Sequence, residues 1–322
     1  MKDHSSATIR EAHPLSISRA GLTWGFLGVL AFSFTVPMTR VAVGAEQMSP
    51  LFVGSGRAVV AALLAAAALA VTRQRRPRGR EWLSVAVVGA GAVVGFPLLT
   101  SFALTEAPAR HGAVVVALLP AATAVVAVLR TRERPGRAFW AAAVIGAIAA
   151  VSFAALQSGG VSGMRPSGGL LFAAVAVCAI AYAEGGVLSR TLGSWQTISW
   201  ALVAASPVMT ILTGAAVAAQ PPSGSVTAWL AFAYLGVVSM FLGFFAWYRG
   251  LAIGPLAQIS QVQLAQPVLS IAWAALLLRE PITVATVLGG GAVIGAALLA
   301  VRSRARRPPG PEGDAEHLGR RG

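Results

Sequence analysis

Two stretches of this sequence, LLPAATAVVAVLRTRERP (residues 118–135) and LAQPVLSIAWAALLLREP (residues 264–281), decide its fold. They belong to a longer ungapped match between residues 104–133 and residues 251–280, at a constant offset of 147 positions. Eight of the thirty positions in this match are identical, and Pro120 aligns with Pro267. The chain therefore contains an internal repeat.

The composition around these stretches is that of a membrane protein. Of the 322 residues 56% are hydrophobic and 11% are charged, and the mean hydropathy is +0.73. A soluble domain carries about 25% charged residues. One cysteine and four scattered histidines form neither an internal disulfide nor a metal cluster, so no metal site or cofactor is predicted.

Apolar runs long enough to cross a bilayer, which takes roughly 20 residues, recur along the chain. They predict an all-α membrane protein with ten transmembrane helices. The predicted spans are residues 20–43, 50–72, 82–104, 110–130, 136–155, 168–188, 195–218, 226–250, 256–278 and 282–302.

The positive charges predict the orientation. The net charge is +14, but the basic residues lie in short clusters between apolar runs and form no contiguous face for nucleic acid. With the N-terminus inside and ten alternating spans, inward segments hold twenty of the 25 basic residues and outward segments hold four. Basic residues in short loops mark the cytoplasmic side. Both termini are thus predicted to be cytoplasmic in a bacterial inner membrane.

The repeat divides the chain into a first five-helix unit over residues 20–155 and a second over residues 168–302. Residues 156–167 connect the units, residues 1–19 form a tail, and the basic tail 303–322 is predicted to be disordered. Because five is odd, the second unit enters the membrane from the opposite side. Inverted repeats are typical of secondary transporters, whose substrate site lies near the midplane. The alternative is an ancient duplication in a protein that transports nothing.

These features resemble the EamA-type transporters of the drug/metabolite transporter superfamily. In that family the fourth helix of each repeat carries a proline near its middle and closes on an acidic residue. The two stretches quoted above fit this pattern. The family's first helix tends to read Trp-Gly, then aromatic residues, then a basic residue, and its second helix commonly carries an arginine. The matching residues here are Trp24, Gly25, Phe32, Phe34, Arg40 and Arg57. The resemblance implies ten helices, a central cavity between the halves and transport of small metabolites, without naming the substrate.

Glu184 is the acid predicted to lie inside a span. Intramembrane acids normally face a partner or a water-filled cavity, and they are functional by default. Glu184 and Tyr182 are therefore candidates for substrate binding or proton coupling. Alternatively, Glu184 forms an ion pair with Arg57, Arg190 or another basic group. The resemblance does not support a role for this acid, since it is not a general family feature.

Arg57 lies about two turns into the second span. It either binds a substrate carboxylate, caps carbonyls of a broken neighbouring helix, or extends to the outer interface. Gln258, Gln261, Gln263 and Gln266 spread over about 200° of the ninth span. They either contact an uncharged or zwitterionic ligand or bond to neighbouring helices.

Prolines and acids at equivalent repeat positions carry further predictions. Pro120 and Pro267 are predicted to be hinges or broken-helix points. Glu133 and Glu280 are predicted to favour the positive end of the helix that follows each of them, with gating salt bridges as the alternative. Trp247 and Tyr248, near an inner helix end, are expected in the interfacial aromatic belt, with a place in the cavity lining as the alternative.

Together these residues favour a secondary transporter that exports an amino acid or a toxic amphiphile, with proton antiport through Glu184 as one hypothesis. An uncoupled uniporter or exchanger is the alternative, and a passive channel or a membrane-embedded enzyme is less favoured. Enzymatic chemistry needs a nucleophile with a base, or paired acids, which the spans lack. The expected partners are a small-molecule substrate and the lipid bilayer, and a homodimer is left open.

Overall fold

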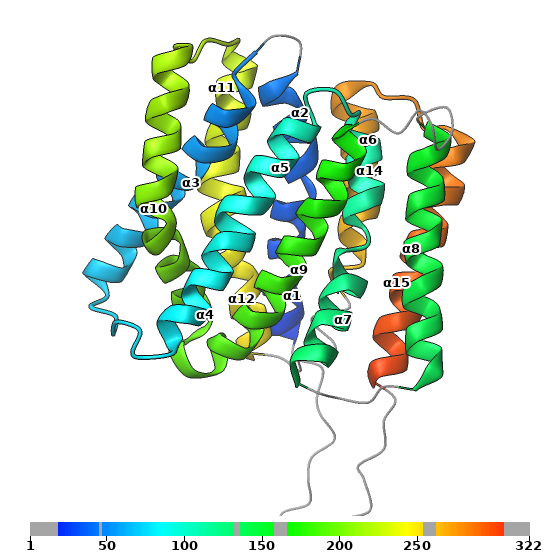
Figure 1. Ribbon diagram of the computed structural model, residues 1–322, viewed down its shortest axis with the longest axis horizontal. Helices are drawn as coiled ribbons and strands as arrows, with labels where there is room; N and C mark the ends of the chain where they lie inside the picture. Colours follow the sequence, from blue (N-terminus) through cyan, green and yellow to red (C-terminus); the bar gives the residue numbers. More distant parts are fainter. Residues whose placement is uncertain (1–18, 45–46, 132–135, 158–165, 254–261, 306–322) are drawn as a thin grey trace, which may run out of the picture.

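The computed structural model describes residues 19–44, 47–131, 136–157, 166–253 and 262–305, and every regular element in these ranges is a helix (Figure 1). Several elements join end to end into longer rods. The elements are α1 (Arg19–Ser33), α2 (Thr35–Val43), α3 (Pro50–Val71), α4 (Glu81–Val88), η1 (Gly89–Gly95), α5 (Phe96–Ala103), α6 (Ala109–Val116), α7 (Leu119–Thr131), α8 (Arg137–Gln157), α9 (Pro166–Leu192), α10 (Ser194–Ala219), α11 (Val226–Ala233), η3 (Tyr234–Leu242), α12 (Gly243–Ile253), α14 (Ala265–Leu278) and α15 (Val284–Ala305).

Seven of these rods are long and apolar enough to cross a membrane. They are Ala20–Val43, Pro50–Val71, Glu81–Ala103, Ala109–Arg130, Pro166–Leu192, Ser194–Ala219 and Val226–Gly250. Three shorter apolar stretches, Arg137–Phe153, Ala265–Leu278 and Val284–Ala296, fall within the remaining predicted spans. The all-helical membrane fold is confirmed, whereas the count of ten crossings stays a prediction.

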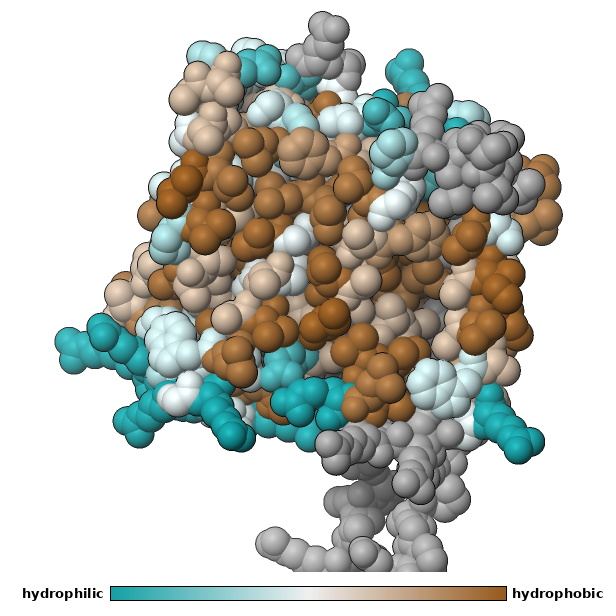
Figure 2. Space-filling model, in the orientation of Figure 1, coloured by the Kyte–Doolittle hydropathy of each residue, from teal (hydrophilic) through white to brown (hydrophobic). Residues whose placement is uncertain are grey.

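The surface matches a bilayer environment. Figure 2 shows an apolar band between two ends where the polar residues gather. Large aliphatic side chains are exposed on the helices of the band, among them Leu63 at 68% and Leu230 at 66%. Helices satisfy their own backbone hydrogen bonds, so a bundle with such a surface is stable in lipid.

The helices pair between the two repeats in a regular order. The close pairs are α1 with α12, α3 with α10, the α4–η1–α5 rod with α9, α6 with α14, and α8 with α15. The first helix of the first repeat thus packs on the third helix of the second repeat, and the third helix of the first repeat packs on the first helix of the second. The second, fourth and fifth helices each pack on their own equivalent in the other repeat. This order is unchanged when the two repeats are exchanged.

Glycines allow two of these crossings to be close. A Cβ added at Gly28 would lie 2.7 Å from the backbone nitrogen of Trp247, and one added at Gly91 would overlap the Val177 carbonyl oxygen. The first contact joins α1 to α12, and the second joins η1 to α9. Small residues allow the backbones of membrane helices to approach in this way.

Three prolines lie next to places where rods break. The first span breaks at Phe34, and Pro37 has no N–H for the Ser33 carbonyl, which instead accepts a hydrogen bond from the Ser270 hydroxyl at 2.7 Å. The α6–α7 rod breaks just before Pro120, and a turn at Gln263 and Leu264 precedes Pro267. Both repeat-related prolines thus lie next to breaks in the helices, and their role as hinges stays a prediction.

Candidate functional site

A central cavity lies between the two repeats, with about 510 Å³ of space between atoms when its open side is included. Its lining comes from the first four helical rods of the first repeat and from α9, η3, α12 and α14 of the second. The lining residues are Phe32, Thr35, Val36, Arg57, Ala92, Phe96, Pro97, Val116, Leu119, Cys178, Tyr182, Ser239, Met240, Phe244 and Gln266. Of the predicted site residues, Arg57, Tyr182 and Gln266 are therefore brought together.

Arg57 is a buried cation on the cavity wall, with 2% of its surface exposed. Ser49 caps α3 by accepting a hydrogen bond from the Phe52 N–H, and Pro50 opens the helix. This start places Arg57 about 10 Å into the span. Its Nη1 donates to the Thr39 hydroxyl at 3.3 Å and its Nη2 to the Thr100 hydroxyl at 3.2 Å, while Nε has no partner. No carboxylate among the described residues pairs with it.

Aromatic rings form one wall of the cavity. Phe32 and Phe244 meet edge to face with centroids 4.9 Å apart, and Tyr182 packs on Phe244 at 6.1 Å. Trp247 and Tyr248, which continue the same helix, are 6% and 5% exposed. Their expected place in the interfacial belt is wrong, because the close α1–α12 crossing covers this end of α12.

A second, smaller cavity adjoins the first and shares Val116, Leu119 and Gln266 with it. It holds about 250 Å³ of space between atoms when its open side is included. Pro120 and Pro267 both line it, together with Gln263. Since Pro120 has no N–H, it leaves the carbonyl of Val116 without its helical donor. The two repeat-related breaks thus face one space. Gln258 and Gln261 lie outside the described residues.

Comparison with known proteins agrees with this architecture. The model of the EamA-like transporter family matches the chain twice, over residues 19–154 and 167–302. The chain belongs to the EamA-like transporter family. It is 43% identical over 270 residues to "Uncharacterized transporter YdeK" of Bacillus subtilis (strain 168), covering 84% of this chain and 93% of that protein. A solved crystal structure shares the fold, with a TM-score of 0.61 and 20% identity over 90% of this chain and 99% of its own. This EamA-like protein is thus a multi-pass membrane transporter and not an enzyme.

Glu184 does not line the cavity of this EamA-like transporter. It follows Tyr182 by two residues, about 200° round α9, and its carboxylate accepts hydrogen bonds from Arg130 Nε at 2.9 Å and from the Ser84 hydroxyl at 2.6 Å. Arg130 and Ser84 belong to the first repeat. The structure therefore places Glu184 in an ion pair between the repeats, with Arg130 as the partner.

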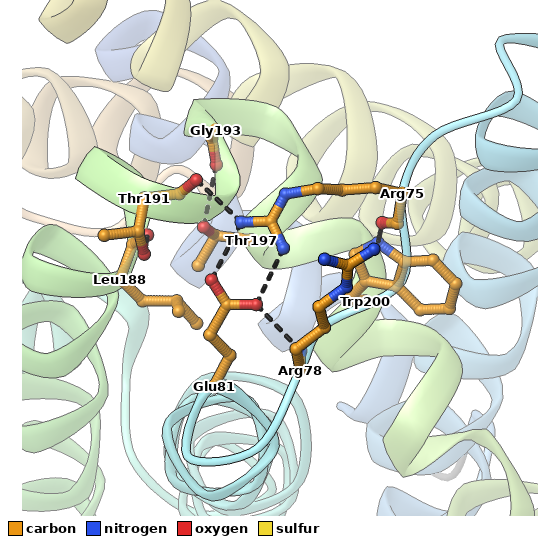
Figure 3. A network of polar contacts seen from close by, with 8 residues as sticks. All are labelled: Arg75, Arg78, Glu81, Leu188, Thr191, Gly193, Thr197 and Trp200. Carbon is orange, nitrogen blue, oxygen red and sulfur yellow. Dashed lines mark hydrogen bonds and ion pairs between the residues drawn. The ribbon is translucent and has the colours of Figure 1, made fainter.

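The same end of the bundle carries a second link between the repeats (Figure 3). We call it the arginine-rich end, defined by residues 72–80 and the last turns of α7 and α9. Arg75 pairs with both oxygens of Glu81 at 2.8 Å and donates to the Thr191 carbonyl, while the Trp200 indole donates to the Arg75 carbonyl. Hydrogen bonding to Glu81 raises the pKa of Arg75, so the guanidinium stays charged.

Glu280 links the repeats at the opposite end, which holds the starts of α6 and α15. Its two oxygens accept the backbone N–H groups of Ala109 and Arg110 at 2.8 Å, and Arg110 Nη1 lies 3.7 Å away. Glu280 therefore caps α6 of the other repeat, and the expectation that it serves the helix following it is wrong. Thr283 caps that helix, α15, by accepting from the Thr286 N–H. Glu133, its repeat equivalent, lies outside the described residues.

Several lining groups escaped prediction from the sequence. Thr35 and Ser239 form a 2.7 Å hydroxyl pair between α2 and η3, and Cys178 lies on the wall beside Tyr182. Two π-helical segments, η1 and η3, occupy the third helix of each repeat and contribute Ala92, Ser239 and Met240. Such segments are frequent at functional sites, but no sequence pattern announces them.

Replacing Glu280 with alanine is expected to destabilise the protein by about 1–3 kcal/mol, because two N–H groups at the start of α6 lose a charged acceptor. Glu106→Ala is the matched control, since Glu106 is an exposed glutamate in the loop before α6. Thermal unfolding in detergent measures both variants. Equal unfolding temperatures for the two would contradict the capping role.

Proposed function

We propose that this protein is a secondary transporter that moves a small metabolite by alternating access between two inverted five-helix repeats. The observation that carries the proposal is the central cavity at the interface of the repeats, with inter-repeat contacts at both ends of the bundle. Two observations support a ten-span topology with both termini in the cytoplasm. The helix pairing stays the same when the two repeats are exchanged, and the arginines gather at one end of the bundle. Residues 20–155 and 168–302 are the two moving units in this proposal.

The contacts at the two ends suggest how access alternates. At the arginine-rich end, Glu184 and the Arg75–Glu81 pair tie the first repeat to α9 and α10. At the opposite end, Glu280 holds α6, and Gln47 accepts the Ser225 N–H at 2.8 Å. Opening one end requires breaking one set of contacts while the other set holds. The breaks at Pro120 and Pro267 supply the hinges, because a helix that is already broken bends at low cost.

Crosslinking either end tests alternating access. In a Cys178→Ser background, we expect a short bis-methanethiosulfonate crosslinker, which forms a disulfide with each cysteine, to stop solute counterflow in Ser84→Cys/Glu184→Cys and in Gln47→Cys/Ser225→Cys, because each pair spans the two repeats. The assay uses proteoliposomes and a panel of labelled amino acids, organic acids and cationic drugs. Reductant should restore movement, and the single-cysteine variants serve as controls. Undiminished flux in both crosslinked proteins would rule out alternating access.

Efflux of the metabolite is the proposed direction, and two coupling mechanisms remain to be separated. A Glu184 that only pairs with Arg130 predicts that Glu184→Gln, Arg130→Gln and the double variant change the transport rate by the same factor. A Glu184 that carries the coupled proton predicts that Glu184→Gln alone abolishes pH-driven uphill transport. We favour the first outcome, because the carboxylate already has two partners and faces away from the cavity. Under that outcome, transport is uniport or exchange with no proton carried by Glu184.

A further inference from the structure

We propose that the central cavity binds a small organic monoanion, with its carboxylate on Arg57 and its apolar body against the aromatic wall. The inference rests on the proposed function in that it takes the cavity to be the transport site. It narrows the substrate to one chemical class.

Charge balance is the first argument. Among the described residues that line the cavity, Arg57 alone carries a formal charge. A buried charge without a counter-ion is costly, and proteins normally pair it. An arriving carboxylate supplies that counter-ion, whereas an amine adds a second positive charge to the same space. The field of Arg57 therefore selects anions over cations.

The hydrogen-bonding state of the guanidinium is the second argument. Its two bonds to threonine hydroxyls are 3.2 and 3.3 Å long, beyond the usual range of charge-assisted bonds, and Nε has no partner at all. Both hydroxyls also donate to carbonyls of their own helices, Thr39 to Thr35 and Thr100 to Phe96. The guanidinium of Arg57 is thus weakly hydrogen-bonded, and it has N–H donors available for a ligand. A guanidinium fork matches a carboxylate in a bidentate pair.

The rest of the wall sets the shape of the ligand. Phe32, Phe244, Val116, Leu119 and Met240 present apolar surface around the cavity. Thr35 and Ser239 already bond to each other, and Tyr182 and Gln266 add one phenol and one amide to a wall that is otherwise mostly apolar around Arg57. A carboxylate with an aromatic or branched aliphatic body satisfies the cation and the apolar wall together, and a sugar satisfies neither.

Three isosteric probes test this class: 3-phenylpropionate, 3-phenylpropanamide and 3-phenylpropylamine. Titration calorimetry on the purified full-length protein measures each dissociation constant. We expect the acid to bind about 10- to 100-fold more tightly than the amide, the range given by hydrogen bonds to a charged group, and the amine to bind most weakly. This comparison uses the wild-type protein alone, so it depends on no variant folding.

Variants then assign the preference to Arg57. Arg57→Gln should bind the acid and the amide equally, and Arg57→Lys should keep part of the preference. Arg249→Gln is the matched control, because Arg249 lies over the Trp24 ring at 5.2 Å and does not line the cavity. It should keep the full wild-type preference.

Three results would overturn the inference: an amide or amine that binds as tightly as the acid, an unchanged preference in Arg57→Gln, or no binding by a series of monocarboxylates from propionate to 3-phenylpropionate. Calorimetry in detergent needs no translocation. An acid that binds but never moves in proteoliposomes would therefore contradict the transport proposal and leave this one standing. An amine that is transported while no acid binds would contradict this inference and leave the transport proposal standing.

Discussion

Arg57→Met is expected to stabilise the ligand-free protein and to abolish transport. The native side chain keeps a charge in a buried site without a carboxylate among the described residues. Replacing a buried ion pair by apolar residues of similar size is often neutral or stabilising by 1–4 kcal/mol, and a buried charge without a partner is costlier still. We expect a gain of about that size here. A transporter that gains stability by losing its binding group illustrates how functional sites are kept at a cost to folding.

The hydroxyl partners explain why this loss is tolerated. Thr39 and Thr100 each retain a hydrogen bond to a carbonyl one turn earlier, at 2.7 and 2.6 Å. Removing the guanidinium therefore leaves no buried hydroxyl donor unsatisfied, which is the usual reason that breaking a polar network is costly.

Thermal unfolding without ligand and counterflow in proteoliposomes measure the two halves of this prediction. Arg249→Met provides the comparison, because it removes an arginine that does not line the cavity. A drop in stability of several kcal/mol in Arg57→Met would mean that Arg57 braces α2, α3 and α5, and its role as a ligand-binding group would then lose its physical basis.

Gly91→Ala is expected to cause a large loss of folded protein. The new Cβ would overlap the Val177 carbonyl oxygen and lie 2.7 Å from the Ala181 Cβ, both on α9. A backbone carbonyl has no rotamer with which to move aside, so η1 and α9 must separate. Overpacking of this kind typically costs 1–3 kcal/mol and occasionally more. We expect at least about 3 kcal/mol here, because the contact is between backbones.

Gly214→Ala is the matched control for Gly91→Ala. Gly214 lies in α10 with nothing within 4 Å of an added Cβ. Alanine forms helix more readily than glycine by about 1 kcal/mol, so this variant should be neutral or slightly more stable. Unfolding temperature and yield of monodisperse protein in detergent compare the two. Similar values for both variants would show that the η1–α9 crossing does not need a glycine.

The residues of the site show which features can be predicted from the sequence alone. The sequence indicates four residues of the site because each is unusual inside an apolar run: the charged Arg57, the amide Gln266, and the prolines Pro120 and Pro267. The sequence does not single out Thr35, Ser239 and Cys178, which also line the cavity, because small polar residues are common in membrane helices. The π-helical segments η1 and η3 pack against α9 and α3, and no local sequence pattern encodes these contacts.

The interaction partners of Glu184 and Glu280 could not be predicted from the sequence. Tyr182 and Glu184 are two residues apart, so a helix directs them about 200° from each other, and only Tyr182 lies on the cavity wall. Glu280 precedes α15 in the chain but caps α6 in space. Neither outcome follows from the position of the acid along the chain.

The amino-acid sequence by itself determined that this is an apolar, helical, twice-repeated membrane protein, because composition, hydropathy and self-similarity are properties of the chain in one dimension. The family followed from the same kind of property. Tertiary structure alone decided which polar groups share the cavity, which basic residue pairs with Glu184 and which helix Glu280 caps. The physical reason is that each depends on the rotation of one helix about its axis and on the neighbour that it packs against, and both are set by contacts between residues far apart in the chain.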